Sequence, residues 1–282
     1  MRAVLRWTAV GAGLLLVLTA GLCLASYRKF SANITTDKAA EQVLAGYAAQ
    51  RPPALVPQAW NILVMGADGA DGAAGEEPGA EADAAVLLHL SADRTRATAV
   101  GVPRGLRVGV PGCHRPGGGT APAAYEPFAA AFRAGGAACS IRAFEQLSGV
   151  RVDHHLVVDV PRFGRIADAV GGGSGDGPGD PRGDLLRALS GAARGGGSLA
   201  HPARLFGLLD SATSAITADP GLSSLPALYG LAGTLRRLPA DRVTLVTLPT
   251  APGAGDVLRR TAADRLFAAL RADRPLRPAP DP

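Results

Sequence analysis

The feature that most constrains this chain is an uncharged segment close to its start. Residues Trp7 to Ser26 carry no charged side chain and consist mainly of Leu, Val, Ala and Gly. Because an α-helix needs about 20 apolar residues to cross the hydrocarbon core of a bilayer, the segment predicts a membrane-spanning helix. A cleavable signal peptide is the alternative, but its apolar core is usually about 7 to 15 residues long. We therefore expect residues 1–29 to form a short cytoplasmic tail and a retained transmembrane anchor.

Charge does not decide the orientation of this anchor. Arg2 and Arg6 precede the uncharged segment and Arg28 and Lys29 follow it, so the two sides are balanced under the positive-inside rule. A short tail followed by a long domain favours a single-pass protein of the cell membrane with its C-terminal domain outside. Cys23 lies within the anchor, after a residue larger than a lipoprotein site accepts, and we do not expect it to be lipidated.

The overall charge does not indicate nucleic-acid binding. The formal net charge is +5, but four of the 29 basic residues flank the anchor, which leaves 25 basic against 24 acidic residues. A nucleic-acid-binding domain needs a basic stripe within a recognisable module, and we find neither. The sequence also lacks a G-x-S-x-G elbow, an H-E-x-x-H motif and a C-x-x-C pair, which argues against a serine hydrolase, a zinc protease and a thiol redox enzyme.

Glycine and proline divide the rest of the chain. Their clusters predict exposed or mobile loops at Gly66–Gly79, Pro111–Pro122 and Gly171–Gly183. Short apolar runs predict strands that are buried on both faces, at Ile62–Met65, Ala84–Leu90, Ala97–Val102, Leu156–Val160 and Val243–Leu248. Apolar residues at helical spacing predict helices over Pro161–Val170, Leu205–Ile216 and Leu225–Leu235.

Together these patterns predict an α/β fold, with α+β as the alternative, in which helices flank a central and mostly buried β-sheet. We expect a juxtamembrane linker over 30–55, one extracellular domain over 56–273 and a disordered proline-rich tail over 274–282. Cys113 and Cys139 both fall in this domain, where an oxidising environment permits a disulfide. Two separate buried thiols are the alternative.

A longer motif adds a family resemblance. Residues Gly149–Val160, GVRVDHHLVVDV, are similar to the signature G-I-R-I-D-H-Y-V-x-V-D-F of the LytR-CpsA-Psr family. The similarity extends upstream through Phe144–Gly149 and downstream to Ala169–Gly172. Adjacent residues on a strand point to opposite faces, so we expect His154 and His155 within this motif to be structural or solvated rather than a metal site.

The resemblance implies a reaction, in which a glycopolymer moves from a polyprenyl-pyrophosphate carrier in the membrane to peptidoglycan with the help of Mg²⁺. Asp68, in Gly-Ala-Asp, and Asp83, in Ala-Asp, resemble the aspartates of the family's G-S-D and S-D-T and would hold the metal. Arg104, in Val-Pro-Arg, resembles the arginine of I-P-R-D and would bind the pyrophosphate. Asp83 and Arg104 are thus the candidate catalytic residues, and Arg182 is a second candidate for pyrophosphate binding. Taken without the resemblance, these residues are more typical of solvated loops.

The sequence departs from the family at positions that matter for charge. Ala70 and Glu81 stand where the family has arginine, and Gly105 stands where it has an acid. The short segment Gly171–Gly183 replaces a strand and a helix start that carry further arginines in the family. The sequence therefore leaves two functions open: an active Mg²⁺-dependent phosphotransferase, or a degenerate homologue that binds lipid-linked precursors or partner proteins.

Overall fold

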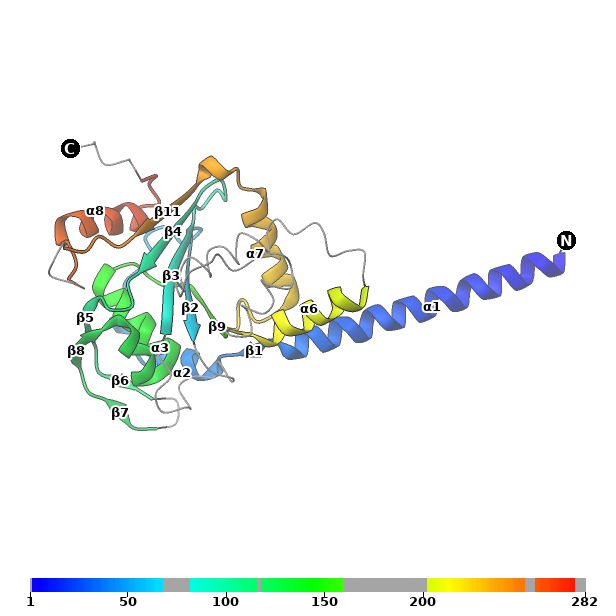
Figure 1. Ribbon diagram of the computed structural model, residues 1–282, viewed down its shortest axis with the longest axis horizontal. Coiled ribbons are helices and arrows are strands. Elements are labelled where there is room, and N and C mark those ends of the chain that lie inside the picture. The colour runs from blue at the N-terminus through cyan, green and yellow to red at the C-terminus, as the bar shows by residue number, and fades with distance from the viewer. Residues whose placement is uncertain (1, 68–81, 116–117, 160–201, 252–256, 277–282) are drawn as a thin grey trace, which may run out of the picture.

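The computed structural model describes residues 2–67, 82–115, 118–159, 202–251 and 257–276 (Figure 1). Within them, a mixed seven-stranded sheet has the order β1-β10-β9-β2-β3-β4-β11. Its strands are β1 (Thr35–Thr36), β2 (Trp60–Ala67), β3 (Ala82–Leu90), β4 (Ala97–Val102), β9 (His154–Asp159), β10 (Ile216–Ala218) and β11 (Val243–Thr247). The fold class expected from the sequence, helices flanking a central sheet, is confirmed.

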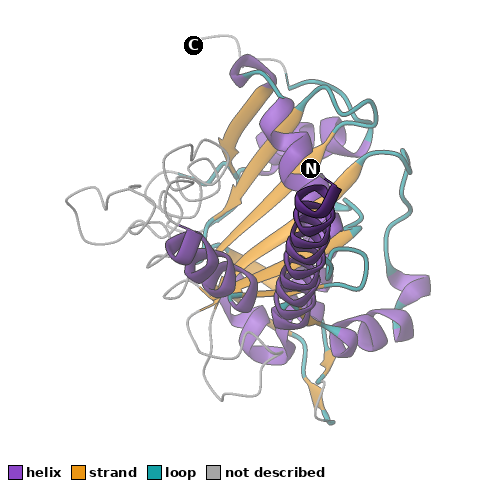
Figure 2. Ribbon diagram, turned by 90° about the vertical axis from the view of Figure 1, so that its right-hand side faces the viewer, coloured by secondary structure: helices purple, strands orange, loops and turns teal. Residues whose placement is uncertain are grey.

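The centre of the sheet is buried on both faces. On β2, Ile62 and Val64 face one side while Leu63 and Met65 face the other, and all four are at most 3% exposed. Alternation with a period of two is what an extended strand imposes, so a continuous apolar run fills both layers. Helices α2 (Lys38–Gly46), α3 (Phe128–Ser148) and α8 (Arg260–Arg271) cover the face that carries Leu63 and Met65, and α7 (Leu225–Arg237) covers the face that carries Ile62 and Val64. The strands twist between these layers (Figure 2).

The long helix α3 is kinked and tied to the strands beside it. Gly136 has φ 65°, a left-handed conformation that glycine adopts readily. At Gly135 a side chain would collide with the sulfur of Cys139, so the kink makes room for a disulfide. This bond joins Cys139 to Cys113 in β6 (Cys113–His114), with the Cα atoms 5.8 Å apart. The structure therefore pairs the two cysteines as expected from the sequence.

Several sequence-based boundaries differ from the structure. The predicted loop Pro111–Pro122 contains a hairpin of β6 with β7 (Thr120–Ala121), beside a second pair of β5 (Arg107–Val110) and β8 (Ala124–Pro127). The helix predicted to end at Ile216 is α6 (Pro202–Ser214); Ile216 instead opens β10, because it pairs with Val158 of β9. The predicted helix Pro161–Val170 lies outside the described residues. The two short 3₁₀ helices are η1 (Ala48–Gln50) and η3 (Ala240–Arg242).

Strand β11 was expected to be buried on both faces, and this is wrong. It lies at the edge of the sheet, pairing only with β4 among the described strands, and Leu245 is 61% exposed. An apolar run alone does not distinguish a central strand from an edge strand, because the neighbours that cover it come from elsewhere in the chain.

Helix α1 (Arg2–Asn33) projects away from the body of the molecule (Figure 1). Its segment Val10–Asn33 is long and apolar enough to cross a bilayer, and none of its most apolar window is buried by the described protein. No other helix within the described ranges meets this criterion. The chain then enters the domain through β1, which lies beside β10.

Candidate functional site

The candidate residues lie at one end of the central sheet, where β2, β4 and β9 finish and β3 begins. The register of the strands shows which of these ends are neighbours. Ala67, the last residue of β2, lies opposite Asp159 of β9 on one side and opposite Ala82 of β3 on the other. Across β3, Ala85 lies opposite Val102, the last residue of β4. Neighbouring strands are about 4.8 Å apart, so the four strand ends extend over roughly 15 Å. We call the strand ends at Asp159, Ala67, Ala82–Asp83 and Val102–Arg104 the candidate edge.

Asp83 lies in β3 at an irregularity of the ladder. Gly66 is opposite Ala84 whereas Ala67 is opposite Ala82, so β3 has one extra residue at this point, Asp83. Such a bulge bends the strand and turns a side chain away from the regular alternation, and bulges are frequent beside active sites. On the other side of β3, continuing the register of Ala85 with Val102 by two residues would bring position 83 opposite position 104. The described ladder ends before that pair.

Arg104 lies on the turn that follows β4, and its side chain is exposed. The start of α3 holds this turn: the amide of Ala129 donates to the carbonyl of Arg104 at 3.1 Å, and the amide of Phe128 donates to Leu106 at 2.8 Å. The first amides of a helix lack partners within the helix, and no side chain caps α3. The two carbonyls therefore fix the turn against the helix, and the arginine is placed on a rigid support.

Asp159 was not selected from the sequence as a site residue. It ends β9 next to Ala67, is 4% exposed, and its amide donates to the carbonyl of Ala215 at 3.0 Å. A buried carboxylate at a strand end is an unusual observation that points to a charged or polar partner. The sequence signal was present, because Asp159 is the acidic residue that closes the apolar run of β9.

The other candidates cannot be placed. Asp68 and Arg182 lie outside the described residues. Among the described ones, no group of three His, Cys, Asp or Glu side chains is arranged to hold a metal ion. Mg²⁺ needs only one or two carboxylates when phosphate oxygens complete its shell, and Asp83 and Asp159 are both carboxylate residues at this edge. The chemistry of these donors fits the metal that the resemblance implies.

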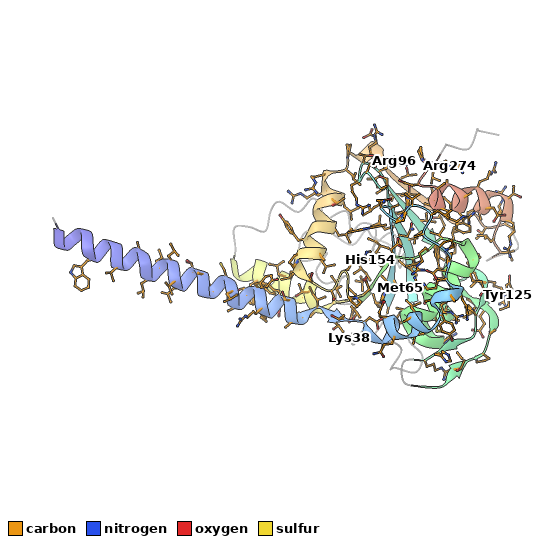
Figure 3. All side chains as sticks on the ribbon, turned by 180° about the vertical axis from the view of Figure 1, so that it is seen from behind. Lys38, Met65, Arg96, Tyr125, His154 and Arg274 are labelled. Carbon is orange, nitrogen blue, oxygen red and sulfur yellow. A yellow bond between two sulfur atoms is a disulfide. The ribbon has the colours of Figure 1, made fainter. Side chains whose placement is uncertain are left out.

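The two adjacent histidines of the motif have structural partners. The Nδ1 atom of His154 lies 3.0 Å from Asp219, and the Nε2 atom of His155 lies 3.3 Å from Asp37. The hydrogen bond to Asp219 raises the pKa of His154 above its usual 6.5, although burial opposes this shift. The rings serve different contacts on opposite faces of β9, in agreement with a structural role. Figure 3 shows His154 close to the middle of the molecule.

The opposite end of the sheet carries a different set of contacts. Arg96 precedes β4 there and lies near Arg274 in Figure 3, with its guanidinium 3.3 Å from Asp273. A small pocket at this end is lined by residues that include Leu55, Asn61 and Arg271. It is far along the strands from Arg104, since Asn61 pairs near the end of β3 distant from Asp83. We therefore do not assign the candidate chemistry to this pocket.

Comparisons with known proteins agree with the fold. TagV from B. subtilis superposes with a TM-score of 0.55 at 14% identity, covering 77% of this chain and 98% of that one. The "LytR-Csp2A-Psr enzyme from Actinomyces oris" gives a TM-score of 0.52 at 20% identity, covering 78% and 93%. TagT bound to LI-WTA gives 0.50 at 16% identity, covering 76% and 90%. At these identities the likeness establishes the fold.

Sequence comparison identifies the family. No curated protein sequence gives a significant match. The model of the LytR_cpsA_psr family, however, matches residues 25–174, which is more than half of the chain and includes β2, β3, β4, α3 and β9. The candidate edge and the motif on β9 both lie within this match, and the chain belongs to the LytR-CpsA-Psr family.

Proposed function

We propose that this protein is a phosphotransferase of cell-wall assembly, which moves a glycopolymer from a polyprenyl-pyrophosphate carrier to peptidoglycan. Family membership supports the general process, and a fold relative, TagT, is bound to a wall teichoic acid ligand. In this proposal α1 anchors the chain and the domain lies outside the cell, where both the carrier headgroup and peptidoglycan are accessible.

The observation that carries the proposal is the register that brings Asp83 and Arg104 to the same edge of the sheet. Transfer from a pyrophosphate requires that the negative charge developing on the phosphate oxygens be neutralised. Arginine matches phosphate with a planar pair of donors. Arg104 is exposed on a turn that the first amides of α3 hold in place, so its side chain is accessible to a phosphate of the carrier.

In the proposed step, a hydroxyl of peptidoglycan attacks the phosphorus that bears the glycopolymer. A new P–O bond forms to this oxygen, the P–O bond to the carrier phosphate breaks, and polyprenyl phosphate leaves. Asp68 and Asp83 would hold Mg²⁺, which when bound supplies positive charge to the phosphate oxygens. Arg104 would bind the oxygens of the leaving phosphate, and a carboxylate of the edge would accept the proton of the hydroxyl.

A second function is favoured by one observation about the sequence. The sequence has Ala70, Glu81 and Gly105 at positions where the family has charged residues. Loss of one preorganised donor can cost about 3 kcal/mol of transition-state stabilisation, so several losses would leave a protein that binds lipid-linked precursor without efficient transfer. Both functions use Arg104 for binding and differ in turnover.

One experiment separates the two functions. Purified chain in detergent is given a polyprenyl-pyrophosphate-linked oligosaccharide and peptidoglycan, and both binding and transfer are measured. We expect Arg104→Ala to weaken binding by about 1.5 to 3 kcal/mol, the range for hydrogen bonds to charged groups. Asp83→Asn should reduce the dependence of transfer on Mg²⁺. Arg242→Ala is the control, because Arg242 precedes β11 at the opposite end of the sheet. Wild-type binding without transfer would favour the degenerate homologue.

Export of the domain is tested separately. An alkaline phosphatase fused after Pro282 should be active in cells, since the enzyme matures only outside the cytoplasm. A stable but inactive fusion would refute the proposed orientation.

A further inference from the structure

Helix α6 lies at the junction between α1 and the domain, and two of its large apolar side chains are partly exposed. Phe206 and Leu209 of α6 are 40% and 41% exposed, although both are large and apolar. Singly exposed leucines are ordinary on a protein surface. These two, however, lie one turn apart, on a helix that packs directly against α1 (Figure 1).

The contacts fix how α6 lies on α1. Near the start of the interface the rings of Phe30 and Phe206 are 4.9 Å apart. Further on, the side-chain amide of Asn33 donates to Asp210 at 2.9 Å and to the hydroxyl of Thr213 at 3.1 Å. Residue numbers increase in the same direction on both helices, so α6 runs parallel to α1. The start of α6 therefore points back along the anchor.

This arrangement sets the height of α6 relative to the bilayer. The uncharged segment of α1 ends at Ser26, and Phe30 lies four residues beyond it, or about 6 Å at the rise of an α-helix. A bilayer with a core of about 30 Å and a full thickness of about 40 to 45 Å has headgroup layers of roughly 5 to 7 Å each. Phe206, in contact with Phe30, is then at headgroup level.

The charges around these side chains suit the same layer. Lys29 lies 2.8 Å from Asp210 and 4.7 Å from the centre of the Phe206 ring. The ion pair neutralises Asp210, so this carboxylate would not repel an anionic surface. Aromatic and basic side chains at the end of a membrane span are typical of the interface.

From these observations we infer that α6 is a membrane-contact surface beside α1, in which Phe206 lies in the lipid headgroup layer and Leu209, about 5 Å further along the helix, lies at the outer boundary of that layer. The inference rests on the anchoring role of α1 in the proposed function. It adds a second point of attachment, because α6 leads through Ala215 directly to Asp159 on the candidate edge. A helix of 13 residues is about 20 Å long, so the edge would be held close to the carrier headgroup rather than swinging on a single helix.

The test measures the depth of single fluorescent labels in the full-length chain, reconstituted in phosphatidylcholine and phosphatidylglycerol nanodiscs. Cys23 is the one free cysteine of the described chain and lies in the anchor, so labelling it with an environment-sensitive dye reports the anchor itself. In a Cys23→Ser background, Leu209→Cys reports α6. Leu245→Cys is the matched control, because Leu245 is an exposed leucine on the far edge strand β11.

We expect lipids that carry a quencher near the headgroup to reduce the emission of the Leu209→Cys label, at least roughly half as strongly as that of the Cys23 label, because interfacial apolar groups reach about 5 to 10 Å into the headgroup boundary. The Leu245→Cys label should be unaffected. If the Cys23 label is quenched while Leu209→Cys behaves like Leu245→Cys, the inference is wrong and the anchor stands. If Leu209→Cys shifts to the blue without quenching, protein covers α6 and the inference is again wrong. If the Cys23 label is not quenched, the anchoring proposal itself fails.

Discussion

Removal of either partner of the buried Arg51–Glu145 ion pair should be the most destabilising change of charge in this domain. Glu145 belongs to the Phe144–Gly149 part of the family resemblance and projects from α3, with a side chain that is 3% exposed. Its carboxylate accepts from Arg51 Nε at 3.0 and 3.1 Å and from Nη2 at 2.7 Å, and also from the amide of Val152 at 2.9 Å. Arg51 in turn donates to the carbonyl of Val152 at 2.6 Å. The pair therefore ties the segment before β2 to α3 and to the approach to β9.

The magnitude follows from this burial. Glu145→Leu leaves the Arg51 charge, 12% exposed, with one carbonyl partner, and Arg51→Met leaves the carboxylate with one amide. Breaking one side of a buried pair costs about 3 to 5 kcal/mol, whereas replacing both sides with apolar groups is often close to neutral. In the double variant the Val152 amide remains unsatisfied, which costs about 1 to 3 kcal/mol. The double variant should therefore be no less stable than either single variant, which requires a coupling energy of at least about 3 kcal/mol.

Guanidinium unfolding of the detergent-solubilised chain, followed by the fluorescence of Trp60 in a Trp7→Phe background, gives the four free energies of unfolding. Asp241→Ala is the control, because its pair with Arg242 is exposed on both sides and should contribute less than about 1 kcal/mol. Single variants that each cost less than 1 kcal/mol, or a double variant whose cost equals their sum, would refute this account of the pair.

Three further predictions concern other contacts. Mutation of both Cys113 and Cys139 to Ala should lower the free energy of unfolding by about 3.5 kcal/mol, the value that the loop-entropy model gives for a sequence separation of 26. The wild type should resist alkylation unless it is reduced. Ready labelling of both thiols in folded protein would contradict the bond. Gly135→Ala should cost about 1 to 3 kcal/mol because its methyl group meets the Cys139 sulfur, and urea titration should show a smaller cost in a Cys139→Ala background. Asp219 raises the pKa of His154, so the stabilising effect of this pair is complete below pH 6.5 and is lost as the pH rises through the raised pKa. The difference in unfolding free energy between wild type and His154→Gln should therefore shrink over that range. A difference that grows with pH would contradict the raised pKa.

Local patterns in the sequence were sufficient to predict the elements with a simple burial pattern. These are central strands that are buried on both faces and helices with one apolar face. Strand β4 has the predicted bounds, and β2 and β3 extend their predicted runs by a few residues, because central strands carry long apolar runs and turn residues flank them. Helix α7 was predicted because one face is apolar. The candidate membrane-spanning helix needed only length and the absence of charge.

Three of the described helices were not predicted, for different reasons. Helix α2 falls within residues 30–55, which the sequence analysis treated as a linker. Most of α3, from Phe128 to Phe144, is buried on all sides, so it shows no apolar stripe that would distinguish a helix. Helix α8 does carry a stripe, at Ala263, Phe267 and Leu270, and the sequence analysis overlooked a signal that was present. The two-residue strand β1 is too short for any periodic signal and exists because Thr35 and Thr36 pair with β10.

The sequence by itself determined the N-terminal helix that is apolar and long enough to span a membrane, the alternation of strands and helices, the family and the types of residue available for chemistry. The tertiary structure decided which of them meet. Only strand order and register bring Asp159, Asp83 and Arg104 to one edge, because these residues are far apart in the chain and each pairing depends on the strand beside it. The bulge at Asp83, the turn held by α3 and the packing of α6 on α1 are likewise set by long-range contacts. Local sequence cannot encode such contacts, since a strand or helix gains its stability from the partner that covers it.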